Sequence, residues 1–297
     1  MFQRKSDVKS KAERVPKKKS VIQENENIRD MLQHITHNSA VVLDLDNTVI
    51  EPVQELGSDQ WFVTVLNYAC KISVDKADAA EAVVDIYHAV QHHTRVQAVE
   101  QNVIFIIKAL QDIGIPIFAL TARGYPILET TLRQLREVGI NFSRQWSDGL
   151  TYLNIGNVSN SACFSQGIIF CNGNEKGKCL NAFFKTADFY PQHVVMVDDK
   201  EKYLKCVKSI VENYGGDFVG LRYSYLDRKV ASLEIEKATE QLTEMYHKLP
   251  EHVQVKVEKF QVSSLTRYSL LAVKKDHVLE SKEENEPQVG SLVRNGI

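Results

Sequence analysis

Short apolar runs alternate with longer amphipathic stretches through most of the chain. An almost wholly apolar run of strand length is typical of a strand buried on both faces of a parallel sheet. Such runs are Ala40–Leu43, Ile115–Leu120, Gly167–Phe170, Val194–Val197 and Phe218–Leu221. Helical periodicity is found over Val99–Ile113, Tyr125–Val138, Glu175–Lys185 and Glu201–Tyr214. Strands that alternate with helices predict an α/β fold with a doubly wound, Rossmann-like parallel sheet.

Two stretches interrupt this alternation. Residues 51–97 contain two helical patterns, Asp59–Ile72 and Lys76–His92, directly after the first strand. We expect them to form a small helical cap above the carboxyl edge of the sheet, where open α/β sheets bind ligands. Residues 141–166 are rich in Asn, Ser and Gly and predict a loop or hairpin beside the same edge. The α/β core is therefore expected to comprise residues 25–50 and 98–250.

The two ends of the chain have compositions that do not support a buried core. Residues 1–24 carry eight basic side chains and few apolar ones, which predicts a disordered tail or, alternatively, an electrostatic or targeting arm. Residues 251–297 form a C-terminal extension that we expect to be largely disordered at its end.

The overall composition limits the classes of protein that the chain can represent. Its 297 residues are 43% hydrophobic and 25% charged, as in an ordinary globular protein. The net charge of −2 argues neither for nor against a nucleic-acid or membrane partner, and we expect no nucleic-acid partner. No run reaches the roughly 18 apolar residues of a membrane span. The N-terminus lacks the apolar region of a secretory signal, and the five cysteines include no CxxC pair. These features predict a cytoplasmic protein with reduced thiols, with non-classical export left open.

Two carboxylates follow the first predicted strand. Asp44 and Asp46 come directly after an apolar run, which would hold their backbone rigidly at the strand end. In the functional interpretation Asp44 is a nucleophile that attacks phosphorus. Asp46 protonates the leaving oxygen and then deprotonates the attacking water. The structural alternative is a pair of loop acids that cap the next turn.

Polar residues also follow later strands. Thr121 comes after the second strand and could hold a phosphoryl oxygen, although Thr at this position is commonly a cap. Lys176 begins a helix, where its charge opposes the helix dipole, and we interpret it as a residue that neutralises the surroundings of the nucleophile and the transferring group, with a solvated surface lysine as the alternative. Arg123 could reach a phosphate or form a surface ion pair. We therefore expect Thr121, Lys176 and Arg123 to contact the substrate.

Adjacent acids end the strand that precedes the last one. Asp198 and Asp199 would be costly to desolvate without a metal ion or a lysine partner. Mg²⁺ suits oxygen ligands of this kind. We expect Asp44, the backbone carbonyl of Asp46 and Asp198 to bind it, with Asp199 as an outer ligand that pairs with Lys176.

Taken in order, these segments resemble the motifs of a known superfamily. Asp44-Leu45-Asp46-Asn47-Thr48, then Thr121, Lys176 and Asp198-Asp199, resemble the four motifs of the haloacid-dehalogenase-like (HAD) hydrolases, over about residues 38–225. The resemblance implies a Rossmann-like domain, Mg²⁺ dependence and catalysis through a phospho-aspartate. An Asp two residues after the nucleophile is similar to the phosphatase branch. The insertion at 51–97 resembles the cap that follows the first motif in many members.

The sequence thus predicts a Mg²⁺-dependent phosphomonoester hydrolase whose phosphorylated substrate is of unknown class. A phosphotransferase would use the same residues. A different alternative is a protein-interaction module, in which the basic N-terminal arm and the stretch Ser232–Lys248 contact a partner protein. Asp59 and Gln60 are weaker candidates for substrate contact, and His88 and His92, spaced i and i+4, are interpreted as a solvated helix face.

Overall fold

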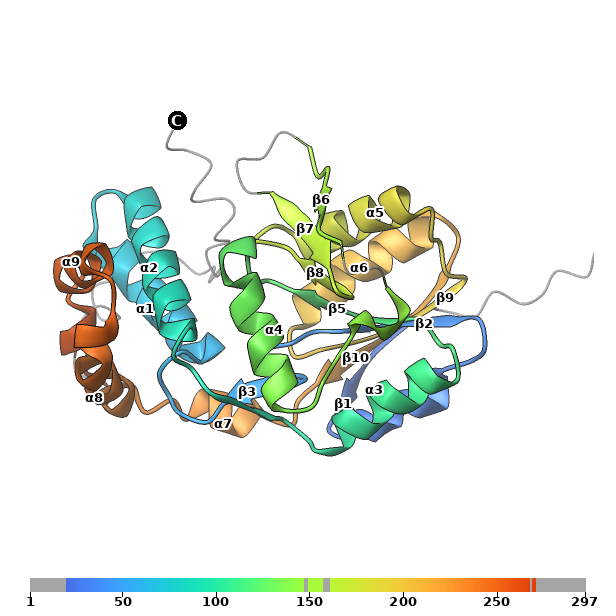
Figure 1. Cartoon of the computed structure of the whole chain (residues 1–297), viewed down its shortest axis with the longest axis horizontal. Coiled ribbons are helices and arrows are strands. Elements are labelled where there is room, and N and C mark those ends of the chain that lie inside the picture. Colours follow the sequence, from blue (N-terminus) through green and yellow to red (C-terminus); the bar gives the residue numbers. More distant parts are fainter. Residues whose placement is uncertain (1–19, 147–148, 157–160, 268, 271–297) are drawn as a thin grey trace, which may run out of the picture.

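A mostly parallel sheet with helices on both faces forms the larger part of the protein (Figure 1). The computed structural model describes residues 20–146, 149–156, 161–267 and 269–270. The strands of this sheet are β1 (Val21–Asn25), β2 (Ser39–Leu43), β5 (Ile117–Thr121), β6 (Thr151–Leu153), β7 (Ala162–Ser165), β8 (Ile168–Phe170), β9 (His193–Asp198) and β10 (Asp217–Tyr223). Their order across the sheet is β1-β10-β9-β2-β5-β8-β7-β6. Neighbours from β1 to β8 run parallel, whereas β7 and β6 are antiparallel additions at one edge.

Alternate residues of the central strands face two separate layers of helices. On one face Val41 and Leu43 pack with residues of η1 (Ile28–His34), α3 (Asn102–Asp112) and α4 (Leu128–Glu137). On the other face Ala40 and Val42 pack with residues of α5 (Lys176–Ala187) and α6 (Glu201–Asn213). Because successive side chains of a strand point to opposite faces, a run of apolar residues serves both layers. The α/β class with buried strands is confirmed.

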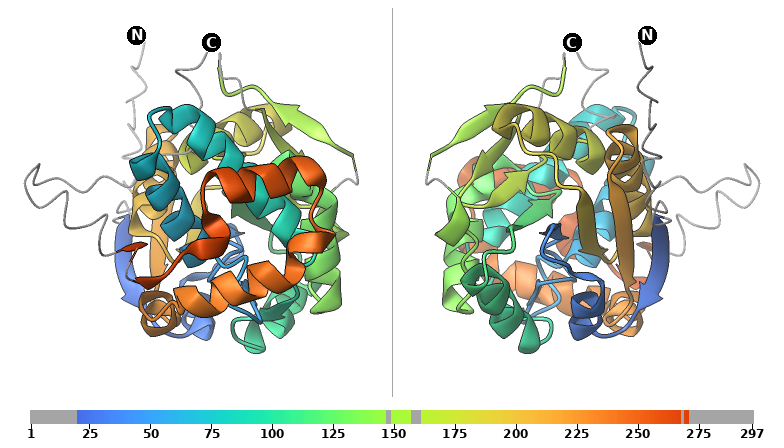
Figure 2. Two further views of the ribbon diagram at one scale, coloured as in Figure 1. Left: turned by 90° about the vertical axis from the view of Figure 1, so that its left-hand side faces the viewer. Right: turned by 90° about the vertical axis from the view of Figure 1, so that its right-hand side faces the viewer.

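Four further helices form a second core beside the sheet, which we call the helical unit: α1 (Asp59–Ile72), α2 (Lys76–Gln91), α8 (Ile235–Met245) and α9 (Glu251–Lys259). In the left view of Figure 2, α8 and α9, in orange and red, lie in front of α1 and α2. An antiparallel pair, β3 (Ile50–Pro52) and β4 (Val96–Ala98), connects α1 and α2 to the sheet. The short helix α7 (Asp227–Ala231) precedes α8.

Helices α8 and α9 correct the predicted boundaries, which assigned residues 98–250 to the core and residues from 251 to an extension. Ile235, Ala238 and Leu242 of α8 are buried with the apolar faces of α1 and α2. Lys259 pairs with Asp78 of α2 at 2.7 Å. Two short helices cannot cover each other's apolar faces completely, so segments far along the chain complete this core.

The N-terminal boundary also differs from the prediction. Residues 21–24, placed in a disordered tail, belong to β1, which pairs in parallel with β10 at the edge of the sheet. Its sequence, VIQEN, has only two apolar residues, and two of its five residues are exposed, so no apolar run marks it. Residues 1–19 and 271–297, which carry the remaining predictions for the tails, lie outside the described residues. Short 3-10 turns complete the described chain: η2 (Tyr125–Ile127), η3 (Ser143–Gln145), η4 (Tyr246–Lys248) and η5 (Val262–Ser264).

Candidate functional site

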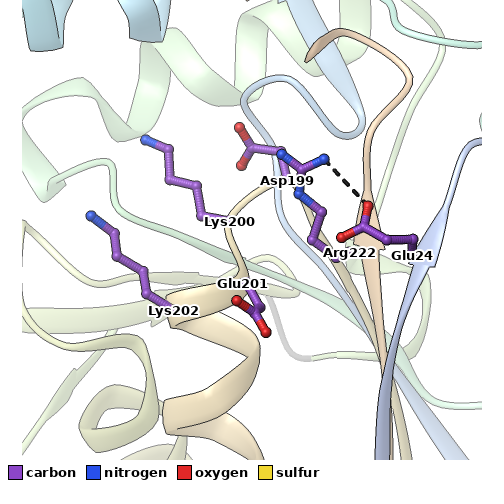
Figure 3. Close-up of a pocket in the computed structure, with 6 residues that line it drawn as sticks. All are labelled: Glu24, Asp199, Lys200, Glu201, Lys202 and Arg222. Carbon is purple, nitrogen blue, oxygen red and sulfur yellow. Dashed lines mark hydrogen bonds and ion pairs between the residues drawn. The ribbon is translucent and has the colours of Figure 1, made fainter.

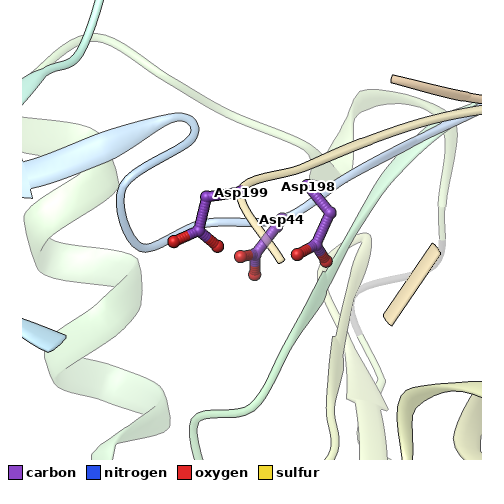
Figure 4. A group of neighbouring side chains, drawn as sticks. All are labelled: Asp44, Asp198 and Asp199. Carbon is purple, nitrogen blue, oxygen red and sulfur yellow. The ribbon is translucent and has the colours of Figure 1, made fainter. Parts of the chain in front are cut away.

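Three carboxylates meet where two neighbouring parallel strands end (Figure 4). Asp44 directly follows β2, and Asp198 is the last residue of β9, with Leu43 and Val197 paired in register. Oxygens of Asp44, Asp198 and Asp199 lie within 4.8 Å of one another, and we call this group the carboxylate cluster. From β2 the chain adds β5 and β8 on one side and then β9 and β10 on the other. The cluster therefore lies between β2 and β9, where the strand order reverses, and α/β sheets commonly bind ligands at such a position.

Lys176 is the cation of this cluster. Its Nζ lies 2.7 Å from Asp44 Oδ1 and 2.7 Å from Asp198 Oδ2, and its side chain is 1% exposed. The ring of Tyr203 on α6 lies 4.4 Å from the same Nζ. The predicted pairing of Lys176 with Asp199 is therefore wrong. Lys176 bridges the two carboxylates that end adjacent strands, and it does so from the start of α5.

The glycine after Lys176 explains how a lysine reaches this position. A Cβ on Gly177 would lie 2.8 Å from the backbone oxygen of Cys206 on α6. The absence of a side chain therefore lets the first turn of α5 pack directly on α6. This close contact fixes the start of α5 beside the ends of β2 and β9.

When its three carboxyl groups are ionised, the carboxylate cluster holds more negative than positive charge. Burial raises the pKa of Asp44 well above its usual value, although Lys176 lowers it. Burial also raises the pKa of Asp199 to about 7, with Lys200 acting in the opposite direction and Asp198 adding to the rise. Burial disfavours the charge of Lys176, but Asp198 and Asp44 outweigh it and raise the pKa of the ammonium. A set of carboxylate oxygens with this excess charge fits a hard divalent cation such as Mg²⁺.

Asp46 has a different environment from Asp44, two residues before it. Its two oxygens accept hydrogen bonds from Arg123 Nε at 2.9 Å and from Arg123 Nη2 at 2.8 Å. The remaining nitrogen of Arg123, Nη1, donates to Thr131 at 3.1 Å and to Gln134 at 2.6 Å. The Asp46 side chain therefore lies in this ion pair and not in the carboxylate cluster.

Two of the residues expected to contact substrate have structural partners. Arg123 is 4% exposed, and all three of its guanidinium nitrogens bind protein groups. We therefore correct its interpretation from a substrate-binding residue to one that positions Asp46. Thr121 ends β5 beside β2, and its hydroxyl accepts a hydrogen bond from the backbone N–H of Arg123 at 3.1 Å. This contact is the local capping role that the sequence left open for Thr121.

The start of α1 reaches this edge of the sheet. Asp59, the first residue of α1, pairs with Lys200 Nζ at 2.7 Å, and Lys200 directly follows Asp199. Asn47 Nδ2 lies 3.5 Å from Gln60 Oε1 and 3.5 Å from Asp199 Oδ2. Sequence reasoning missed Lys200 and Asn47. Their adjacency to the Asp198-Asp199 and Asp44-Asp46 motifs is the signal that could have identified them.

A hollow opens beside Asp199 on the side of β10 and β1 (Figure 3). Its volume is about 440 Å³, and it is lined by Glu24, Asp199, Lys200, Glu201, Lys202 and Arg222. Glu24 and Arg222 point toward each other across it, with 3.5 Å between Glu24 Oε2 and Arg222 Nη1. Acidic and basic side chains are equal in number here, so the wall has no net charge that would select one sign of ligand.

The histidines of α2 are not gathered as metal ligands. His92 Nδ1 lies 2.6 Å from the hydroxyl of Thr130 on α4, and burial lowers the pKa of His88 to about 4. Among the described residues, the group of three or more potential metal ligands is Asp44, Asp198 and Asp199. His92, the C-cap of α2, is exposed as expected for a solvated helix face, whereas His88 is half-buried and does not fit that interpretation.

Comparison with known proteins identifies a family but no activity. The model of the DUF2608 family, described as "Protein of unknown function", matches residues 21–255, so the chain belongs to this family. A "Putative outer membrane protein" of Chlamydia pneumoniae is 23% identical over 186 residues, which is 63% of this chain and 69% of the relative. A protein of the same name from Chlamydia trachomatis is 18% identical over 200 residues, or 66% and 74% of the two chains. An uncharacterized protein of Rickettsia prowazekii is 22% identical over 204 residues, or 66% and 73%. No solved structure matches significantly.

These findings overturn the interpretation that the chain belongs to the HAD superfamily. The matching family is DUF2608, and the chlamydial relatives carry an unrelated name. The resemblance rested on four motifs of one to five residues. Side chains of this kind at strand ends describe a type of site, which unrelated families can share, and do not establish membership. Separately, no helix in the described part of the chain is both long enough and apolar enough to cross a bilayer.

Proposed function

Because this chain belongs to a family described only as proteins of unknown function, we propose its activity from its own site: Mg²⁺-dependent hydrolysis of phosphate monoesters through Asp44. The observation that supports this most is the buried lysine between two carboxylates. Lys176 Nζ is 2.7 Å from both Asp44 and Asp198, in a cluster that also contains the carboxyl group of Asp199. Such an arrangement costs folding free energy and is characteristic of functional sites.

In the proposed reaction, Asp44 Oδ attacks the phosphorus of the substrate. The bond from phosphorus to the ester oxygen breaks, and Asp46 supplies the proton that the leaving oxygen takes. Asp46 then accepts a proton from a water molecule whose oxygen attacks the phosphorus of the aspartyl phosphate. The bond between phosphorus and Asp44 breaks, which releases inorganic phosphate and restores both carboxyl groups. Asp46 must take up a proton from water before it can act as the acid of the first half-reaction, and its ion pair with Arg123 suits the carboxylate form that the second half-reaction requires.

The other residues of the site would bind and orient the phosphoryl group. Lys176 is placed to donate to a phosphoryl oxygen beside Asp44, and the hydroxyl of Thr121 could donate to another. Asp44, Asp198 and Asp199 would hold Mg²⁺, with the backbone carbonyl of Asp46 as a further ligand. When bound, the ion would supply positive charge that offsets the carboxylates and the phosphate.

The same proposal includes the finer architecture and the cellular location. We infer that the sheet is doubly wound in the Rossmann-like sense and that α1 and α2 act as a cap over the site. We also propose a cytoplasmic location, which fractionation of cells would test. The chlamydial relatives carry the name "Putative outer membrane protein". Recovery of this chain in the membrane fraction would therefore contradict the proposal.

The two alternative functions, a phosphotransferase and a protein-interaction module, predict different observations. A phosphotransferase would use the same residues and would give a phosphorylated acceptor in place of inorganic phosphate. An interaction module that uses Ser232–Lys248 would have to expose that stretch, whereas Ile235, Ala238 and Leu242 of α8 are buried in the helical unit. The basic arm of the same alternative lies almost entirely outside the described residues.

The test is hydrolysis of an aryl phosphate by the full chain, with Mg²⁺ and with a chelator. We expect turnover that the chelator abolishes and that Asp44→Asn lowers by about a thousandfold or more. Asn has the shape of Asp, so the thermal transition should persist. Asp30→Asn, which changes an exposed carboxyl group on η1, is the matched control and should retain parental turnover. Parental turnover in Asp44→Asn, or no turnover from about pH 5 to about pH 8, would refute the proposal.

A further inference from the structure

A chain of buried hydrogen bonds leads from Asp46 to the loop before α1. Arg123 Nη1 donates to Gln134 Oε1 at 2.6 Å, and Gln134 Nε2 donates to Gln91 Oε1 at 3.0 Å. Gln91 Nε2 then donates to the backbone oxygen of Gly57 at 2.6 Å. Gln134 and Gln91 are each 0% exposed, so water cannot replace their partners. We call these two residues the glutamine relay.

The glutamine relay crosses the junction between the α/β part and the helical unit. Gln134 lies on α4 beside the sheet, whereas Gln91 is the last residue of α2. Gln134 Nε2 also lies 3.1 Å from the backbone oxygen of Thr94 in the chain that leaves the helical unit. If the helical unit moved away from α4, Gln134 would lose every partner of its amide nitrogen. The hydrogen bonds that hold the Gln134 side chain in position against Arg123 are therefore complete only when the helical unit is docked.

The far end of the relay lies at the start of α1. Gly57 has φ of +81°, and a Cβ there would lie 2.6 Å from Thr94 Oγ1, so the loop is tightly packed. Ser58 follows and caps α1 by accepting a hydrogen bond from the N–H of Trp61. Asp59 comes next and pairs with Lys200 beside the carboxylate cluster. The relay thus connects Asp46 with the backbone that positions α1 at the site.

We propose that Gln134 and Gln91 are positioning residues, which hold Arg123 on Asp46 when the helical unit is docked and so couple the orientation of Asp46 to that docking. The coupling rests on the proposed function only in its consequence for catalysis, since the hydrogen-bonded path exists independently of any reaction. Both glutamines act through Arg123 and touch neither the carboxylate cluster nor the substrate.

The test substitutes Gln91, which contacts neither Asp46 nor Arg123. We expect Gln91→Leu to speed hydrogen exchange of the backbone amides of Asn47 and Thr48 by about threefold or more, as measured on the full chain with Mg²⁺. These amides are hydrogen-bonded within the Asp46 loop, to the backbone oxygens of Ile50 and Leu45. With an aryl phosphate, kcat should fall about tenfold while KM stays within about twofold, because orientation and not binding is lost.

Thr94→Val is the matched control. It removes a buried hydrogen bond from the Thr94 hydroxyl to the backbone oxygen of Val90, and it keeps both glutamine side chains and the Thr94 backbone oxygen that Gln134 contacts. It should leave exchange at Asn47 and Thr48 unchanged. In a double-mutant cycle, the variant with both Gln134→Leu and Gln91→Leu should show the same rate of exchange as Gln134→Leu alone, because both substitutions break the same path of hydrogen bonds.

Two results would overturn the coupling: equal effects of Thr94→Val and Gln91→Leu on the Asp46 loop, or faster exchange confined to the helical unit. If the parent chain shows no hydrolysis, the proposed function fails. The exchange measurements still decide whether the coupling is right, because they need no substrate.

Discussion

Two buried ionic groups lie side by side at the carboxyl edge of the sheet, and they differ in how completely their charges are balanced. Asp46 and Arg123 form a closed pair, in which both carboxylate oxygens and all guanidinium nitrogens have partners. In the carboxylate cluster Lys176 pairs with Asp44 and Asp198, and among the described residues Asp199 has no ammonium in direct contact. The balanced pair fixes geometry, whereas the unbalanced cluster is poised to bind a cation.

The largest expected effect is the loss of the cluster's one ammonium. Lys176→Met would leave Asp44 and Asp198 buried without their common partner, and each is at most 5% exposed. Breaking a buried pair in this way costs about 3–5 kcal/mol of the free energy of unfolding. We expect this loss in urea denaturation of the metal-free protein, with partial recovery when Mg²⁺ is added.

Arg123→Met is the matched comparison for the balanced pair. The side chain of Asp46 is 15% exposed, so water can solvate it after the substitution, and the loss should be smaller than for Lys176→Met. Mg²⁺ should not restore it, because Asp46 offers its side chain to Arg123 and not to the cluster. A larger loss in Arg123→Met than in Lys176→Met would contradict the distinction between the two groups.

The second effect is a dependence of stability on pH in the metal-free protein. Burial raises the pKa of Asp199 from its ordinary value of 3.8 to about 7. The folded chain therefore holds more protons than the unfolded chain between these values, so stability falls as pH rises through that window. Between pH 5 and pH 7 the fall should be about 2 kcal/mol. Saturating Mg²⁺, which favours the ionised carboxylates, should remove it.

Asp199→Asn is the control for the pH dependence, since the amide does not titrate in this window. The variant should lose much of the fall in stability between pH 5 and pH 7. Urea midpoints measured at several pH values with a chelator present would show this. If the free energy of unfolding of the metal-free protein instead rises with pH over this range, the charges of the ionised carboxylates are already compensated by nearby cations.

Local sequence pattern predicted the positions of the acids but not their partners. Asp44 and Asp198 were recognised because each follows an apolar run that becomes a strand, and strand ends of a parallel sheet meet at one edge. The direction of a side chain is not encoded locally, so Lys176 was expected beside the nucleophile Asp44 but was paired with Asp199 in place of Asp198. Arg123 was judged from its closeness to Thr121, whereas its partners on α4 became visible only in the fold.

The helical unit shows the same limit on a larger scale. The periodicity of residues 51–97 predicted α1 and α2 correctly. It carried no information that α8 and α9, more than a hundred residues later, would cover them. Packing between distant segments depends on complementary apolar faces. The sequence of one helix shows that it has an apolar face but not which other helix covers that face. The glutamine relay was missed for this reason, since Gln91 and Gln134 are ordinary polar residues until α2 and α4 meet.

The smallest expected effect concerns the ion pair that joins the helical unit to the cluster. Asp59 and Lys200 are 25% and 23% exposed, so solvent screens the 2.7 Å contact. Lys200 outweighs burial and lowers the pKa of Asp59, which keeps the pair ionised at neutral pH. Asp59→Asn should cost about 1 kcal/mol or less, and the cost should shrink as salt is added.

Asp78→Asn is the matched control for this ion pair, because Asp78 also lies in the first turn of its helix and pairs with Lys259 at 2.7 Å. Both variants lose the same interaction with a helix dipole, so the difference between them isolates the effect of partial burial. We expect Asp59→Asn to be the more destabilising in urea denaturation at low salt. Equal losses would mean that partial burial adds nothing to the contact between Asp59 and Lys200.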